Sequence, residues 1–215
     1  MYVPSSFQES DLQEIFALIE ENPLGTVVTC RKNRLDANHI PFLIESTAAE
    51  SISLIAHVAR NNALWSEASS GEVVLVVFRG ADGYISPNWY PGKRKNENQV
   101  PTWNFQAVNI EGILEVLDSE KFVRGVVARL TTRQEARQPR PWKMTDSEPG
   151  YINANLQQIC GVRVKVTQIS AKYKLGQNRT EEDWLGAAEG AGKSGNKALE
   201  AAMLKAHEKK RRAAP

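Results

Sequence analysis

The chain has 215 residues, of which 41% are hydrophobic, enough for one well-sized domain or for one domain with an appendage. Its formal net charge is only +2, which excludes a global electrostatic field that would draw the whole molecule to nucleic acid. Two cysteines exclude a disulfide framework, although a single bridge stays open, and no apolar stretch reaches the length that spans a membrane.

The first half of the chain predicts one helix followed by short strands. Residues 10–22 carry apolar side chains at helical spacing, and Asn22 with Pro23 ends that helix. β-Branched and apolar runs then predict strands over 24–30, 37–45, 51–58 and 72–80. The last run is almost unbroken, so we expect a central strand buried on both faces. The connections are too short for repeated βαβ crossovers, which favours antiparallel pairing.

Residues 84–109 combine aromatic, proline and basic side chains, and they do not read as a core strand before Trp103. Two aromatic and polar clusters, SPNWY and VPTWNF, flank the hydrophilic loop KRKNENQ. This composition predicts a rim of flat rings and hydrogen-bonding side chains around a planar ligand. An alternative stays open, in which these aromatic side chains only close one end of a barrel.

The second half of the chain predicts a long strand, 101–117, followed by a helix over 120–136 that Ser119 caps. A further helix, an alternating strand and a helix that begins near Thr180 follow, at 151–160, 161–169 and 180–184. The small, Gly-rich stretch after it reads as a flexible linker. The tail from Asn196, rich in Ala, Lys and Glu, can be a helix but has little apolar face to hold it in place. About six strands without regular β-α alternation favour a β-barrel with peripheral helices.

Few residues offer side-chain chemistry. The histidines are His39, His57 and His207, and with two cysteines far apart in sequence they predict neither a metal site nor a catalytic set. HVARNN, residues 57–62, is more informative, because a strand ends there and Arg60 stands where a short helix begins. Backbone N–H groups and a guanidinium at such a junction predict a phosphate cradle, to which the two asparagines add donors.

Six motifs, in order along the chain, resemble those of the PaiB family, which is described as FMN-binding negative transcriptional regulators with a flavin-binding split barrel. They are the N-terminal MYVPSSF, HIP at 39–41, HVARNNALW at 57–65, YISPNWY at 84–90, VPTWNF at 100–105 and KLGQNR at 174–179. The resemblance runs to about residue 190. The chain departs from the family pattern at Asn88, Phe105 and Asn109, where Ser, Tyr and His are usual.

The resemblance implies a mainly β fold with peripheral helices, an FMN-binding split β-barrel over residues 1–190, followed by a flexible basic tail over 191–215. It implies a homodimer with FMN at the subunit interface, its phosphate near 57–62, and its ring against the two aromatic clusters, at least one of which comes from the other chain. The expected cofactor-binding residues are His57, Val58, Ala59, Arg60, Asn62, Ser86, Trp89, Tyr90, Thr102, Trp103 and Asn104.

The function expected from this resemblance is negative regulation of transcription by an FMN-binding protein. The sequence has no clear helix-turn-helix, so contact with DNA is expected to be indirect or weak. The alternative is a flavin-dependent oxidoreductase, in which the cofactor carries the redox chemistry, and a smaller alternative is haem handling through His39 or His57. The first ten residues lack the segments of a signal peptide, so we expect a cytoplasmic protein without membrane contact.

Overall fold

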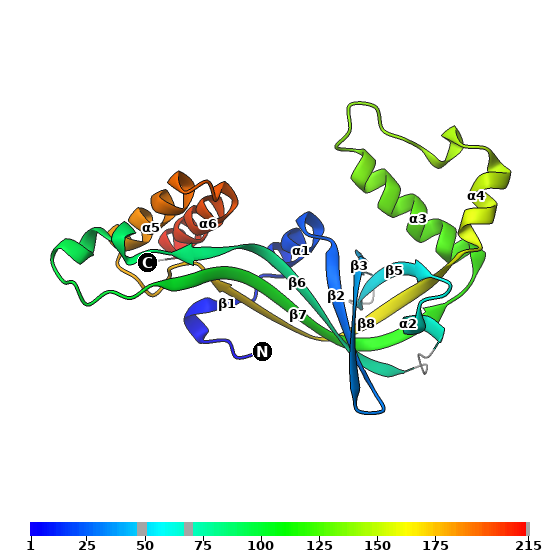
Figure 1. The fold of residues 1–215 in the computed structure, drawn as a ribbon, viewed down its shortest axis with the longest axis horizontal. Coiled ribbons are helices and arrows are strands. Elements are labelled where there is room, and N and C mark those ends of the chain that lie inside the picture. The colour runs from blue at the N-terminus through cyan, green and yellow to red at the C-terminus, as the bar shows by residue number, and fades with distance from the viewer. Residues whose placement is uncertain (47–50, 67–70, 214–215) are drawn as a thin grey trace. The chain divides into compact units, whose positions relative to one another are not determined.

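The computed structural model describes residues 1–46, 51–66 and 71–213. Its strands form one eight-stranded sheet in the order β3-β2-β6-β7-β8-β5-β4, with β1 paired to β8 (Figure 1). The strands are β1 Gln8–Glu9, β2 Leu24–Arg31, β3 Arg34–Pro41, β4 Leu43–Ser46, β5 Ile52–Ala59, β6 Glu72–Ile85, β7 Thr102–Leu117 and β8 Ile159–Lys174. The helices are α1 Leu12–Glu21, α2 Ala63–Ser66, α3 Glu120–Glu135, α4 Pro149–Leu156, α5 Glu181–Lys193 and α6 Lys197–Ala213. Short 3-10 helices are η1 Ser5–Phe7, η2 Pro87–Trp89, η3 Pro91–Arg94 and η4 Met144–Asp146.

The chain divides into two compact units, which are described separately. Unit 1 comprises Met1–Glu21, Arg79–Val108 and Ser170–Pro215. Unit 2 comprises Asn22–Phe78 and Asn109–Ile169. Each of the long strands β6, β7 and β8 has one part in unit 1 and the other part in unit 2.

Unit 2 is built on antiparallel pairs, β2 with β3 and with β6, and β5 with β4 and with β8. Helix α3 covers β5 with the apolar stripe expected of an amphipathic helix. Its Val126 and Leu130 pack with Leu43 and Ile55 in a buried cluster. The predicted cap is confirmed, because the Ser119 side chain accepts from the backbone N–H of Phe122 at the first turn.

Two strand predictions need correction in unit 2. The single strand expected over 37–45 is two strands, β3 and β4, which separate at Phe42 directly after Pro41. Strand β6 is not buried on both faces. Val74 and Val76 are buried, whereas the side chain of Val73 is 65% exposed. Antiparallel sheets commonly leave one face exposed to solvent. Because the run in β6 is apolar at every position, its sequence does not show which residues lie on the exposed face.

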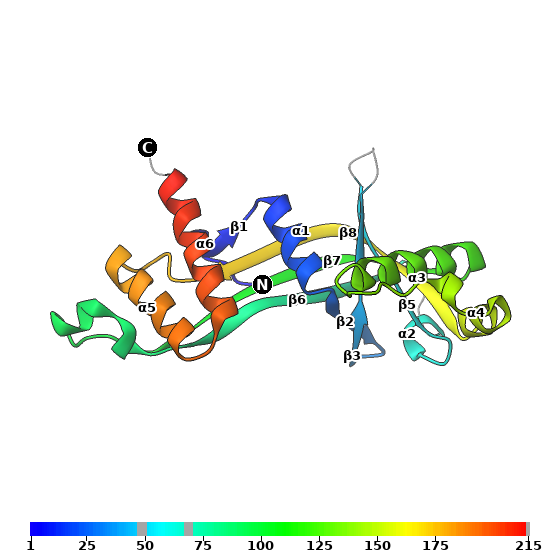
Figure 2. The same cartoon turned by 90° about the horizontal axis from the view of Figure 1, so that it is seen from above.

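Unit 1 contains the largest difference from the sequence analysis. The Gly-rich stretch and the tail, expected to be flexible, form helices α5 and α6, which lie side by side (Figure 2). A side chain at Gly190 would collide with the Trp89 ring, and one at Gly186 with the Trp89 carbonyl oxygen and Pro91. These glycines therefore let α5 pack closely against η2 and η3. On α6, Leu199 and Met203 are 1% and 0% exposed. The apolar stripe of the tail is therefore narrow, but these two side chains on it are buried.

Salt bridges hold the basic part of α6 to the N-terminal segment of unit 1. Lys205 pairs with Glu14 at 2.6 Å, and Lys209 pairs with Glu9 at 2.9 Å. Lys210 of α6 donates to the carbonyl oxygen of Gln177 at 2.8 Å. The cationic end of the chain is thus partly neutralised within its own unit. No helix in the described part of the chain is long and apolar enough to cross a membrane.

The two cysteines, both free, offer a test of unit 2. Cys30 is exposed and Cys160 is buried, and burial raises the pKa of the Cys160 thiol to about 11. Because the thiolate is the reactive form, a maleimide at neutral pH should label Cys30 within minutes and leave Cys160 unlabelled until the protein unfolds. Mass spectrometry of peptides before and after denaturation measures this. Equal labelling of both thiols in the native protein would contradict the placement of β8.

Candidate functional site

The segment His57–Asn62 ends strand β5 in unit 2, as the sequence predicted for a phosphate cradle. Val58 is buried in the core, whereas Ala59 is exposed. The Nδ1 atom of His57 is buried and has no hydrogen-bond partner among the residues that the structure describes. Burial also lowers the pKa of His57, because a desolvated imidazolium is disfavoured, so the ring is neutral near neutral pH. A neutral ring with a free nitrogen can still accept or donate one hydrogen bond.

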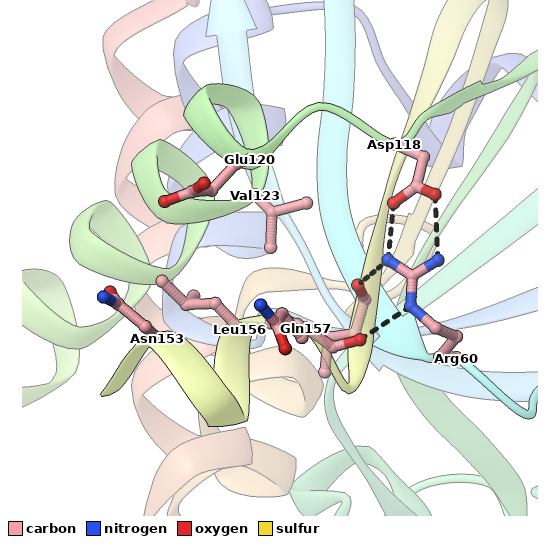
Figure 3. Close-up of a pocket in the computed structure, with 8 residues that line it drawn as sticks. Arg60, Asp118, Glu120, Val123, Asn153, Leu156 and Gln157 are labelled. Carbon is pink, nitrogen blue, oxygen red and sulfur yellow. Dashed lines mark hydrogen bonds and ion pairs between the residues drawn. The ribbon is translucent and has the colours of Figure 1, made fainter. Parts of the chain in front are cut away.

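Arg60 is held from several sides (Figure 3). Its Nη1 and Nη2 donate to the two carboxylate oxygens of Asp118 at 2.8 and 2.6 Å. Its Nε donates to the carbonyl oxygen of Gln157 at 2.7 Å, and Nη2 also donates to that of Ile159 at 2.9 Å. These contacts use all but one of the guanidinium N–H groups. The arginine therefore ties β5 to the start of β8 and to the residue that follows β7.

A pocket of about 290 Å³ lies beside this pair. It is lined by Arg60, Asp118, Glu120, Val123, Asn153, Leu156, Gln157 and Ile159 (Figure 3). Its charged groups are one guanidinium and two carboxylates. The hydrogen bonds from the guanidinium lower the pKa of Asp118, so this carboxylate is ionised at neutral pH. A phosphate group that bound Arg60 would have to replace one anion, Asp118, with another.

The Asn62 side chain is also engaged within unit 2. Its Nδ2 donates to Oδ1 of Asn38 at 2.8 Å, and its Oδ1 accepts from the backbone N–H of Leu64 at 2.7 Å. This amide thus fixes the turn that leads into α2. Within the predicted cradle, His57 has a buried polar atom that lacks a partner among the described residues.

In unit 1, Tyr84 and Trp103 form an exposed aromatic pair. Their ring centroids are 6.4 Å apart with an interplanar angle of 69°, and the side chains are 50% and 52% exposed. The indole Nε1 donates to Oδ1 of Asp82 at 3.0 Å, which fixes the orientation of the ring. An exposed, oriented indole is a surface on which a flat heteroaromatic ring can stack.

The other predicted ring contacts in unit 1 are less open. The Ser86 hydroxyl accepts from the backbone N–H of Asn88 at 3.2 Å and so caps η2. Tyr90 is 3% exposed, and the guanidinium of Arg179 lies 4.6 Å from its ring centroid. Asn104 is 3% exposed and donates to the thioether of Met203 at 3.6 Å. Helix α6 therefore covers the Asn104 face of β7.

Successive residues of a strand point to opposite faces, and β7 shows this clearly. Trp103 lies on the exposed face and Asn104 on the face beneath α6. The alternative that Trp103 plugs the barrel core is therefore wrong, because half of its surface is exposed. Trp89 lies between these extremes, half-buried where Gly186 and Gly190 of α5 approach it.

Three charged residues that were not predicted lie beside the predicted ones. Asp118 pairs with Arg60, and Lys174 donates to the hydroxyl of Thr102 and to the carbonyl oxygen of Trp103, the latter at 2.9 Å. Arg179 lies over Tyr90, as described above. The signal for Lys174 and Arg179 was present, since both belong to the KLGQNR motif, whereas nothing in the sequence connected Asp118 with β5.

Known proteins agree with the family that the motifs indicated. The family described as "Putative FMN-binding domain" matches residues 1–168. The chain is 34% identical over 189 residues to the protease synthase and sporulation protein PAI 2 of Bacillus subtilis, and the match covers 88% of each chain. The chain belongs to the PaiB family of FMN-binding domain proteins.

This PaiB-family chain also resembles more distant proteins. An uncharacterized protein of Saccharomyces cerevisiae is 31% identical over 158 residues, which is 65% of this chain and 93% of the yeast protein. Among solved structures, the FAD and haem binding protein of Mycobacterium smegmatis has a TM-score of 0.54 at 17% identity, covering 79% of this chain and 74% of that one. The flavocytochrome Anf3 of Azotobacter vinelandii has a TM-score of 0.55 at 16% identity, covering 83% and 74%. These likenesses confirm the expected flavin-binding split-barrel fold.

FMN, the cofactor of the family, fits the residues of this PaiB-family chain unequally. The exposed indole of Trp103 suits the ring, which has apolar faces and a polar rim. The free Nδ1 of His57 suits a polar group of the ligand. The Arg60 guanidinium fits a phosphate only after Asp118 has moved away. Within residues 1–46, 51–66 and 71–213, no group of three or more metal-ligating side chains is present.

Proposed function

We propose that this chain is an FMN-binding transcriptional regulator of the PaiB type. The proposal is carried by its family membership over residues 1–168 together with the exposed Tyr84–Trp103 pair. In unit 1, the exposed face of Trp103 is the proposed contact of the FMN ring. In unit 2, the end of β5 near His57 and Arg60 is the proposed contact of a phosphate. The spectrum of the purified protein, with the bound flavin identified by chromatography, is the first test. A colourless protein that takes up no FMN on titration would contradict the proposal.

The position of the ring can be tested at Trp103. The Trp103→Ala variant should bind FMN about 2- to 10-fold more weakly, because a stacking contact of about 0.5–1.5 kcal/mol is lost. Flavin fluorescence that the indole quenches should partly recover. The stability of the variant should change far less than the roughly 3–5 kcal/mol of a buried tryptophan, since the ring is 52% exposed. Fluorescence titration and urea unfolding measure the two quantities.

Two other variants serve as controls for this test. Trp142 is 40% exposed and lies outside the predicted segments, so Trp142→Ala should leave FMN affinity unchanged. Asn104→Ala changes the opposite face of β7. If Asn104→Ala weakens FMN binding and Trp103→Ala does not, the ring lies on the covered face and the assignment is reversed.

A homodimer with FMN at the subunit interface is part of this proposal, and at least one of the two aromatic segments comes from the partner protomer. An exposed pair of large rings, Tyr84 and Trp103, is a surface that a partner or ligand would shield from water. Sedimentation of the flavin-loaded protein at micromolar concentration should give a dimer. A monomer that retains its flavin would show that one chain suffices to bind it.

Regulation is proposed to involve indirect or weak contact with DNA. Part of the basic end of the chain is already engaged, because Lys205 and Lys209 pair with Glu14 and Glu9 at 2.6 and 2.9 Å. Neutralised cations release few counterions on binding nucleic acid and add little affinity. A cytoplasmic location is included in the proposal, and the two free cysteines, Cys30 and Cys160, agree with a reducing compartment.

A flavin-dependent oxidoreductase is the second candidate. The fold is shared with a flavocytochrome and with an FAD and haem binding protein, and flavin chemistry needs little help from side chains. Adding NADH or NADPH to the FMN-loaded protein, then an oxidised acceptor, separates the candidates. Catalytic turnover supports the enzyme, whereas flavin-dependent retention of DNA without turnover supports the regulator. Haem handling through His39 or His57 is a smaller alternative, and a Soret band on titration with haemin that is lost on changing either histidine would support it.

A further inference from the structure

A small cavity in unit 1 is too small for FMN, although Tyr90, Thr102 and Asn104, three of the expected cofactor-binding residues, line it. Its volume is about 130 Å³, well below the roughly 300–1,000 Å³ of pockets that hold drug-sized ligands. It is lined by Phe7, Tyr90, Thr102, Asn104, Lys174, Gly176, Asn178, Arg179, Trp184, Ala187 and Met203. The space suits a group of a few heavy atoms and excludes a three-ring isoalloxazine.

Two cations line the cavity, Lys174 from the end of β8 and Arg179 from the loop that follows. No aspartate or glutamate is among the described residues that line it. The buried Asp183 lies outside the lining, and its carboxylate accepts the backbone N–H of Gly92 at 2.7 Å. Burial first, and then the charges of Lys172 and Arg179, lower the pKa of Lys174. An anion in the cavity would offset this mutual repulsion.

The hydrogen-bonding capacity of the two cations is not exhausted. The ammonium of Lys174 donates to Thr102 and to the carbonyl oxygen of Trp103, which leaves one of its three N–H groups. The Nη1 of Arg179 donates to Oε1 of Gln99 at 3.0 Å, and the guanidinium also hydrogen-bonds to the Tyr90 side chain. Of its five N–H groups, further ones remain. The cavity therefore has charged donors to spare.

A buried indole adds a neutral donor. Trp184 is 2% exposed, and its Nε1 has no hydrogen-bond partner within the described residues. Gly176, at φ +108°, brings the loop backbone against the indole edge, where a Cβ would lie 2.9 Å from Nε1. Few buried donors in native proteins go unsatisfied, so each such group calls for a partner. The Asn104 amide contributes another N–H, since its thioether partner on Met203 is a weak acceptor.

We propose that this cavity binds a small oxyanion, and that a short-chain carboxylate is the class that fits best. Lys174 and Arg179 supply the charge, Trp184 and Asn104 supply neutral donors, and Phe7, Ala187 and Met203 offer an apolar wall for the alkyl end. A planar carboxylate matches the paired N–H groups of a guanidinium. All residues that line the cavity belong to unit 1.

Isothermal titration of the flavin-free, full-length chain tests the proposal. Acetate and butyrate are titrated as sodium salts at constant ionic strength, with chloride as the reference and phosphate as a separate arm. We expect saturable binding of the carboxylates and none of chloride. Lys174→Gln should weaken carboxylate binding about 10- to 100-fold, the loss expected for a charge-assisted hydrogen bond. Lys172→Gln removes a charge from the same strand without touching the lining, and should change the affinity less than about threefold.

The Trp184→Phe variant keeps the ring and removes its N–H, so it tests the site even if Lys174→Gln is poorly folded by circular dichroism. We expect a loss of carboxylate affinity of about 2- to 10-fold. Carboxylate binding that is absent in the wild type, or equal in the wild type and both cavity variants, overturns the proposal. Binding of phosphate alone overturns the carboxylate class. Competition between acetate and FMN would show that the cavity takes part of the flavin, and would overturn a separate site.

Discussion

Replacing Met203 with alanine is expected to lower the free energy of unfolding by about 2–5 kcal/mol, the cost of a cavity left by a large buried side chain. Met203 is fully buried on α6, where it accepts from the amide of Asn104. The loss should appear as a lower midpoint of urea unfolding with an unchanged slope. A change of this size cannot arise at a flexible tail, so the experiment decides whether α6 is part of the folded unit.

The neighbouring Leu204 provides a matched control on the same helix. It is 40% exposed, so Leu204→Ala should change the free energy of unfolding by no more than about 0.5 kcal/mol. Alanine is the best helix former, so helix propensity favours neither variant. Equal, small effects of the two substitutions would mean that α6 does not dock in solution.

Removing the Arg60 guanidinium is expected to weaken FMN binding about 10- to 100-fold, because a charge-assisted hydrogen bond to phosphate is worth about 1.5–3 kcal/mol. Riboflavin lacks the phosphate, so Arg60→Ala should affect riboflavin much less. Parallel fluorescence titrations with the two flavins measure the difference. An equal loss for both would mean that Arg60 does not contact the phosphate.

The Asp118 carboxylate makes this test sharper. Asp118→Asn keeps the size of the side chain and removes the charge that holds Arg60 through two hydrogen bonds, at 2.8 and 2.6 Å. A phosphate would no longer have to displace an anion, so FMN affinity should stay the same or increase in this variant. If Arg60 is only a structural tie, Arg60→Ala and Asp118→Asn should each lower stability slightly without separating FMN from riboflavin. The side chains of the pair are 39% and 41% exposed, so its contribution to stability is small.

Local patterns predicted much of this fold. The helical spacing and the Ser119 cap identified α3, and β-branched runs identified β2 and β5 close to their observed bounds. These elements depend on their own residues and on a single buried face, which is what periodicity measures. The split-barrel fold was predicted from the family motifs, because no local pattern of residues indicates how the strands are arranged.

The errors arose where a distant partner decides the structure. The glycines after Thr180 resemble those of a linker. Gly186 and Gly190 instead leave room for Trp89, a residue far away in the sequence, which packs where their side chains would be. Likewise, the sequence predicts that Arg60 is free to bind a phosphate. In the structure its guanidinium N–H groups donate to Asp118, which lies on another segment. Sequence separation hides both contacts, because neither residue pair follows a helical or strand period.

The order of the segments along the chain has a consequence for synthesis on the ribosome. Unit 1 draws on three separate stretches, and the last of them begins at Ser170. Unit 2 ends at Ile169, so all of its residues have been made before the final helices of unit 1 exist. Until Met203 emerges, Asn104 of β7 lacks the side chain that covers it in the folded unit. Unit 1 therefore stays incomplete after all residues of unit 2 have been made, and this interval is when chaperones have most exposed apolar surface to shield.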